Sequence, residues 1–199
     1  MKAILISIRS PHACNILNLI KLWEIRKKFS KYYVGWVYIY VTKALPHLSK
    51  TYVGDYEVYD DTQWDKEWLD LNGKVVARFW CDKVEEIDDC FTIEHIGNEY
   101  PDTYELGAME EEQLLKECCL TKEEMNAYYK GVKEPLKAIH ITKLEIFDEP
   151  KELSEFNVWG IDYPTGIIDP LHDCNVYYKK KLKPLTRAPQ SWCYVEVTL

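Results

Sequence analysis

The sequence predicts an α+β protein in which strands predominate, arranged as a small mixed β-barrel with flanking helices and inserted segments. Three observations support this fold class. The chain opens on a strand-like run, one short amphipathic helix follows it, and most later apolar runs are rich in β-branched and aromatic residues. With 199 residues, a single domain spanning 1–199 is the simplest organisation.

The first fifty residues carry the clearest element signals. Lys2–Ile8 (KAILISI) predicts a strand, and Ser10 followed by Pro11 predicts a helix that has Ser10 as its N-cap. Lys21–Arg26 (KLWEIR) mixes polar and apolar residues and indicates an exposed strand or extended segment. Trp36–Lys43 (WVYIYVTK) is the strongest strand signal in the chain.

An insertion is expected next, at about 44–72. Proline, glycine, aromatic residues and acids alternate there without a period, and a short helix is expected near Trp64–Leu71. Asn72-Gly73 predicts a turn, after which Lys74–Ile87 predicts one long strand.

The second half combines a helical insertion with further strands. In the insertion, at about 88–135, Met109–Cys118 has helical periodicity and Thr121-Lys-Glu-Glu124 is a capping box that opens a second helix. Leu136–Phe147 predicts a strand that Pro150 ends. A third insertion, at about 157–183, indicates a long surface loop or a hairpin, and Trp192–Val197 predicts a final strand.

Charge is unevenly distributed along the chain. The formal net charge is −8, which taken alone argues against a nucleic-acid partner. Residues 1–50, however, hold nine Lys and Arg against one acid, whereas residues 51–135 hold eight against 23. A basic first third is therefore diluted by an acidic middle segment, and an anionic partner stays open.

The seven cysteines include no CxxC pair, and no secretory signal precedes them, so we expect reduced thiols in a cytoplasmic protein. No Cys/His spacing indicates a metal site, and we expect no cofactor. No apolar run approaches the length needed to cross a bilayer, so we expect a soluble protein without a membrane partner.

Several segments, in order, resemble the ASCH family, a branch of the PUA-like barrels related to RNA-binding PUA domains, of the type found in bacteria and their phages. The matching segments are KAILISI at Lys2–Ile8, the helix leading into Lys21–Arg26, VYIYVTK at Val37–Lys43, GKVVARFWCDKVEEI at Gly73–Ile87, AIHITKLEIFDEPKELSEF at Ala138–Phe156 and APQSWCYVEV at Ala188–Val197. Together they cover about half of the chain. The family pattern G-x-K-x-x-E-x-R has its lysine at Lys21, but Leu19 occupies the glycine position, so the preceding turn must form without the conformational freedom of glycine.

Lys21, Glu24 and Arg26 form the most distinctive chemical group. A lysine and an arginine can hold a phosphate or a base edge, and a carboxylate can accept a hydrogen bond from an exocyclic amine or orient water. The resemblance implies that this group lies at the mouth of a cleft beside the barrel. The alternative is a solvated strand with an internal ion pair.

Other residues are candidates for the same cleft. Thr42 and Lys43 follow a strand, and a tract near the C-terminus offers Arg187, Gln190, Ser191 and Trp192. Trp23 and Trp192 offer faces on which an unpaired base can stack, although most of the seven tryptophans are expected to be core residues. His12, near the helix start, is a candidate contact for a phosphate, whereas His140 is expected to be structural.

Three function hypotheses follow. The leading one is an RNA- or nucleotide-binding module that uses this basic cleft. The second is a small hydrolase, either a ribonuclease or a nucleoside amidohydrolase, because some relatives act on acylated cytidine. In those relatives a threonine follows the lysine by three residues, and Glu24 stands at that position here, so that particular activity is in doubt and Glu24 is left as a general base. The third is a protein-interaction adaptor that works through residues 51–135.

Overall fold

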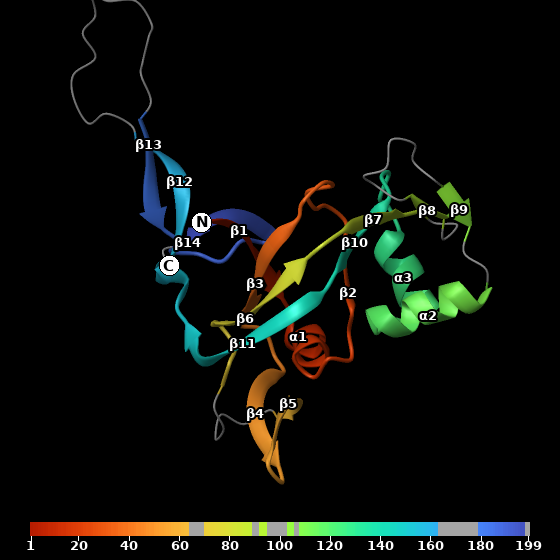
Figure 1. The fold of residues 1–199 in the computed structure, drawn as a ribbon, viewed down its shortest axis with the longest axis horizontal. Coiled ribbons are helices and arrows are strands. Elements are labelled where there is room, and N and C mark those ends of the chain that lie inside the picture. The colour runs from red at the N-terminus through yellow and green to blue at the C-terminus, as the bar shows by residue number, and fades with distance from the viewer. Residues whose placement is uncertain (64–69, 89–91, 95–102, 106–107, 163–178, 198–199) are drawn as a thin grey trace, which may run out of the picture.

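The computed structural model describes residues 1–63, 70–88, 92–94, 103–105, 108–162 and 179–197. Strands predominate and helices flank them, which confirms the α+β class (Figure 1). The described strands form three open sheets of seven, five and two strands. Closure of these sheets into a barrel is not shown.

The seven-stranded sheet is the centre of the molecule. Its order is β11-β6-β3-β1-β14-β12-β13, with β1 and β3 parallel and the other neighbours antiparallel. Its strands are β1 (Lys2–Ile8), β3 (Gly35–Val41), β6 (Val75–Cys81), β11 (Thr142–Lys151), β12 (Phe156–Asp162), β13 (Lys179–Pro184) and β14 (Trp192–Val197). The amino group of Met1 donates to the carbonyl of Val197 at 2.9 Å, so the first strand and the last lie side by side.

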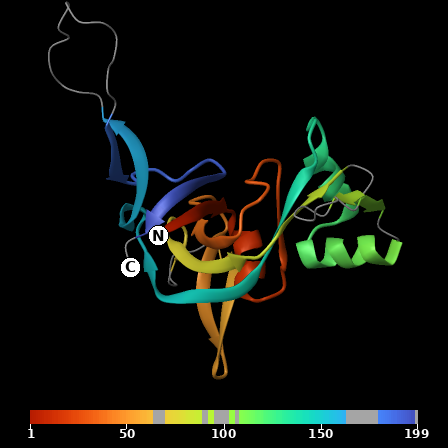
Figure 2. The same cartoon turned by 45° about the horizontal axis from the view of Figure 1, so that its top comes forward.

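Two smaller sheets complete the strands. The five-stranded sheet has the order β2-β10-β7-β8-β9, and the third sheet is the hairpin β4-β5. Their strands are β2 (Trp23–Arg26), β10 (Leu136–His140), β7 (Val84–Ile87), β8 (Thr92–Glu94), β9 (Thr103–Glu105), β4 (His47–Val53) and β5 (Tyr56–Gln63). Figure 2 shows the β4-β5 hairpin projecting away from the rest of the molecule.

Two predicted long strands are each divided between sheets. Lys74–Ile87 forms β6 and β7, and the tract beginning at Leu136 forms β10 and β11. The two divided tracts pair with each other twice. In the large sheet β6 pairs with β11, and in the five-stranded sheet β7 pairs with β10. Pro150 does not end its strand; β11 lies at the edge of its sheet, where a missing N–H is tolerated.

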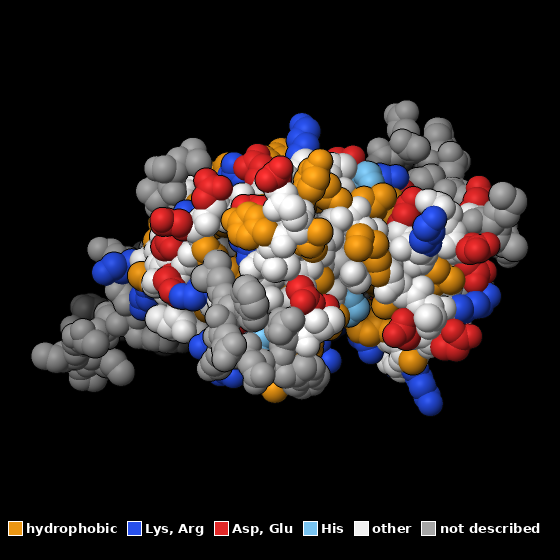
Figure 3. Space-filling model, turned by 90° about the horizontal axis from the view of Figure 1, so that it is seen from below, with side chains coloured by type: hydrophobic (Ala, Val, Ile, Leu, Met, Phe, Trp, Pro, Cys, Tyr) orange, Lys and Arg blue, Asp and Glu red, His pale blue; other side chains and the backbone are white. Residues whose placement is uncertain are grey.

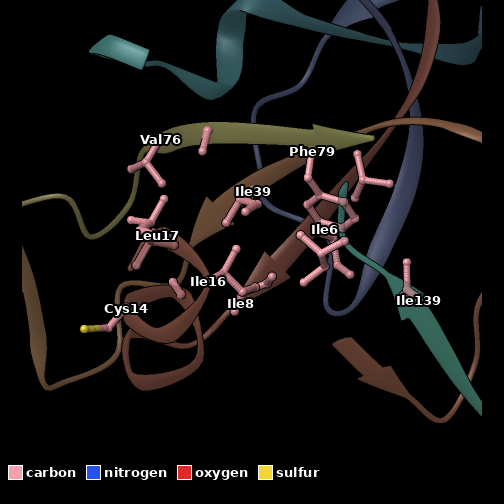
Figure 4. Packing of buried hydrophobic residues seen from close by; sticks show 14 of the residues in the cluster. Ile6, Ile8, Cys14, Ile16, Leu17, Ile39, Val76, Phe79 and Ile139 are labelled. Carbon is pink, nitrogen blue, oxygen red and sulfur yellow. The ribbon is translucent and has the colours of Figure 1, made fainter. Parts of the chain in front are cut away.

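The helix α1 (Ser10–Leu17) packs against the large sheet. Its N-cap is Arg9 rather than the predicted Ser10, with Pro11 in the first turn as expected. Ser10 instead donates its hydroxyl to Oδ1 of Asn72 at 3.1 Å. The buried side of the helix meets strand residues of β1, β3 and β6, and Figure 4 shows Ile16 and Leu17 facing this core.

Residues 44–72 differ from the predicted irregular insertion, because they contain the β4-β5 hairpin. The helix predicted near Trp64–Leu71 falls largely outside the described residues. The interpretation of the third insertion as a hairpin is confirmed for β12 and β13.

Two helices stand beside the five-stranded sheet. They are α2 (Ala108–Cys118) and α3 (Lys122–Tyr129), and the predicted capping box of Thr121 and Glu124 is present. A second apolar cluster joins them to β2 through Leu114, Met125 and Trp23. Figure 3 shows several acidic side chains at the end of the molecule where these helices lie. None of the helices in the described ranges has the length and apolarity that a membrane span requires.

Candidate functional site

A cavity of about 510 Å³ lies where the large sheet, α1, β2 and α3 meet. Its size is that of a site for a small organic ligand. Its lining comprises Ser7, Ile8, Arg9, His12, Lys21, Glu24, Ile25, Arg26, Thr42, Leu120, Glu124, Tyr128 and Gln190. Three of the predicted site residues, Lys21, Glu24 and Arg26, are therefore brought to one cavity together with Gln190.

The segment carrying these charges is buried, which corrects the prediction of an exposed strand. Lys21 is 2% exposed and Glu24 is 4% exposed. The segment is enclosed because β2 pairs with β10, with Glu24 opposite Ile139, and because the amide of Leu22 donates to the carbonyl of Glu117 in α2. Figure 1 shows β2 between α1 and these helices. Local alternation alone did not reveal that both sides of the segment would be covered.

Glu24 lies between two cations. Its Oε1 is 2.9 Å from Nε of Arg26, and its Oε2 is 3.6 Å from Nζ of Lys21. The contact with Arg26 is an ion pair without a hydrogen bond, because the N–H of Nε does not point at the carboxylate. The backbone binds the other side of each cation: Lys21 donates to the carbonyl of Cys118, and Nη2 of Arg26 donates to the carbonyl of Ser7 at 2.6 Å. The buried charges are thus held in one arrangement by partners on three elements.

The electrostatics of the cavity keep Glu24 ionised. Burial alone would raise its pKa, but the charges of Arg26, Lys21 and His12 outweigh burial and hold the pKa of Glu24 below its usual value. The pKa of His12 is lowered, first by burial and then by Lys21 and Arg26, against the opposing effect of Glu24. The cavity therefore presents a carboxylate, two fixed cations and an imidazole whose neutral form is favoured.

Thr42 contributes to the cavity lining a buried polar atom that has neither a hydrogen-bond nor an ion-pair partner in the described part of the chain. Oγ1 of Thr42 is buried, yet nothing among the described residues donates to it or accepts from it. A buried hydroxyl left without a hydrogen bond costs about 1–3 kcal/mol, so such groups mark strain or a contact made by a ligand.

The remaining predicted residues have different surroundings. Lys43 and Arg187 line a neighbouring cavity, and Gln190 lines both. Trp23 is buried against His140, with ring centroids 4.5 Å apart, and donates to Glu117. Trp192 donates to the carbonyl of Lys28 and packs on Phe29, at a ring distance of 5.2 Å. Neither tryptophan nor Ser191 lines either cavity.

The sequence reasoning missed the contribution of α3. Glu124 and Tyr128 line the cavity from this helix, and Leu120 lines it from just before the helix. Tyr128 and Glu124 are one helical turn apart, so they share a face of α3, but nothing in their spacing indicates what that face covers. Tyr128 contributes a phenol ring to the cavity lining, and Nζ of Lys27 lies 5.0 Å from the centroid of this ring.

Within the described ranges, no group of three or more His, Cys, Asp or Glu has the arrangement of a metal site. The free thiols of Cys14, Cys81 and Cys118 are buried, and burial raises their pKa values. They are therefore poor nucleophiles at neutral pH. No family model matches the chain, and no curated protein matches it.

Proposed function

We propose that the chain is an RNA- or nucleotide-binding protein with a PUA-like arrangement of strands, and that the cavity holds one nucleoside unit. The observation that carries the proposal is the buried Lys21–Glu24–Arg26 group facing a cavity of about 510 Å³. Nucleobase edges present donors and acceptors side by side, and a fixed carboxylate between fixed cations is complementary to such an edge. The division of β6–β7 and β10–β11 between two sheets supports the barrel-like part of the proposal.

The ionised state of Glu24 favours a binding function over a hydrolytic one. A general base works best with a pKa near the working pH, whereas Arg26 and Lys21 stabilise the ionised form of Glu24 and lower its pKa. A carboxylate so stabilised is a good hydrogen-bond acceptor and a weak base. The adaptor hypothesis is also less favoured, because α3 supplies part of the cavity wall.

Tyr128 provides a test of binding that does not disturb the core. It is 38% exposed, so replacing it removes little packing. We expect Tyr128→Leu to weaken binding of short single-stranded RNA or ribonucleoside monophosphates about tenfold, the loss typical of one base-stacking contact. The measurement is fluorescence anisotropy for RNA and calorimetry for mononucleotides.

Tyr32→Leu is the matched control, because Tyr32 is 76% exposed, lies outside the cavity and has Lys31 6.0 Å from its ring centroid. Its affinity should equal that of the wild type. The proposal is wrong if no RNA and no mononucleotide binds at millimolar concentration, or if both tyrosine variants lose the same affinity.

Thr42→Val separates binding from stability. Valine has the shape of threonine without the unpartnered hydroxyl, so the free energy of unfolding should stay the same or rise. Ligand affinity should fall, because the hydroxyl is then missing from the cavity. Urea denaturation and calorimetry measure the two effects; a variant that binds as tightly as the wild type would contradict a ligand contact at Thr42.

A further inference from the structure

A second cavity, of about 750 Å³, adjoins the first. The two share Ser7, Thr42 and Gln190 in their linings. The second cavity is lined by residues of β1 and β3, by Thr42, Lys43 and Gly73, by residues 152–154 and by residues 185–190. The two cavities are therefore neighbours that meet at Ser7, Thr42 and Gln190.

The two cavities differ in whether their cations are free to bind an anionic ligand. In the first cavity, Lys21 is buried and Arg26 is partly buried, and both are engaged by Glu24 and by backbone carbonyls. In the second, Lys43 and Arg187 are exposed, and neither has an ion-pair or hydrogen-bond partner in the described ranges. An incoming anion thus meets two cations whose charges are not already compensated within that part of the chain.

The acidic residue of the second cavity does not cancel these charges. Glu152 forms an ion pair with Lys74, and its backbone amide bonds Glu155 at 2.7 Å. Lys43 is also positioned by the chain: its side chain lies over Gly73, where an added Cβ would come within 3.0 Å of Cε. Gly73 has φ +84, so a glycine is favoured there on both steric and conformational grounds.

We infer that the second cavity is a phosphate subsite, in which Lys43 and Arg187 bind the phosphate of a nucleotide whose nucleoside occupies the first cavity. The inference rests on the proposed function and names the ligand class as phosphorylated nucleosides. Arginine presents a planar fork that matches phosphate oxygens, and lysine adds a compact charge beside it. The phosphate has two sources, a free mononucleotide or the neighbouring unit of an RNA strand.

The test compares each of the four ribonucleosides with its 5′- and 3′-monophosphates by calorimetry on the full chain. We expect one of the monophosphates to bind at least about tenfold more tightly than its nucleoside, because its phosphate accepts charge-assisted hydrogen bonds that the nucleoside cannot form. Lys43→Gln and Arg187→Gln should each remove most of this advantage and leave nucleoside affinity unchanged. Lys133→Gln, an exposed lysine outside both cavities, should change neither.

A tetranucleotide distinguishes the source of the phosphate. If the subsite binds an internal phosphate of RNA, each substitution reduces the slope of log affinity against log salt concentration for the tetranucleotide by about one. If it binds a free mononucleotide, tetranucleotide affinity stays below that of the monophosphate. Nucleosides and monophosphates that bind equally well would overturn the subsite and leave the proposed function standing, whereas no binding by any of them would overturn both.

Discussion

Leu19 has a backbone conformation that leucine rarely adopts. Its φ is +59°, directly after α1, and its amide donates to the carbonyl of Ile16 at 2.9 Å. This left-handed conformation is the usual place for glycine at a helix C-terminus. No glycine stands at this position, and a strained leucine instead forms the turn that leads to Lys21.

Leu19→Gly should therefore stabilise the protein. The side chain is 69% exposed, so its removal loses little buried surface, while relief of the left-handed strain is worth about 1 kcal/mol. Leu19→Ala is the control, because alanine keeps the strain and should not be more stable than the wild type. Urea denaturation measures both; equal stability for the two variants would show that backbone strain is not the cause.

Glu24 is expected to stabilise the folded protein by neutralising two cations of the cavity. Glu24→Gln leaves Lys21 and Arg26 buried without a carboxylate, which should cost about 3 kcal/mol in the free energy of unfolding at pH 7. Because the pKa of Glu24 is lowered on folding, its contribution is full above pH 4.5 and is lost as pH falls through the folded-state pKa. The difference in the free energy of unfolding between the wild type and Glu24→Gln should therefore become smaller in acid. A difference that is constant from pH 7 to pH 3 would contradict the ionised buried carboxylate.

Among the helices and strands, local sequence signals predicted that an element forms better than they predicted where it begins and ends. The starts of β1 and α3 follow from residues within a few positions, namely the KAILISI run and the Thr121–Glu124 box. The division of Lys74–Ile87 into β6 and β7 depends on distant partners, β11 for one part and β10 for the other. The β4-β5 hairpin was missed although its two-residue turn, Gly54-Asp55, is a hairpin signal, because the aromatic and acidic residues around the turn lack a strict alternation.

The Thr121 cap gives a prediction for α3. Thr121 accepts from the amide of Glu124 at 3.1 Å, and the carboxylate of Glu124 accepts from the amide of Thr121 at 2.8 Å. Thr121→Ala should cost about 1 kcal/mol of stability and weaken ligand binding, because α3 carries the wall of the cavity. Thr121→Ser keeps the hydroxyl and should restore both properties. Thermal denaturation and nucleotide titration measure them, and an alanine variant with unchanged binding would argue against a role for α3.

At the scale of the whole molecule, the basic first third is partly neutralised. Lys21 and Arg26 are paired with Glu24, and Lys31 is paired with Glu86 at 2.7 Å. The count of charges along the chain shows where basic residues are concentrated, but it does not show which of these charges are compensated by ion pairs. The sequence pointed to Lys21, Glu24 and Arg26, which the structure brings to one cavity. Their burial and the presence of Tyr128 in the lining depend on tertiary packing, which no local pattern encodes.

Binding of a nucleotide in the cavity beside Lys21, Glu24 and Arg26, as proposed, would change the surroundings of nearby backbone amides. The most direct measurement is nuclear magnetic resonance on the ¹⁵N-labelled full chain, titrated with each of the four ribonucleoside 5′-monophosphates. The account predicts that shifts of backbone amides centre on Glu24, Thr42 and Gln190, and that Lys133 is unaffected. Shifts confined to the exposed pair Lys27 and Lys28, or no shifts at millimolar nucleotide, would contradict it.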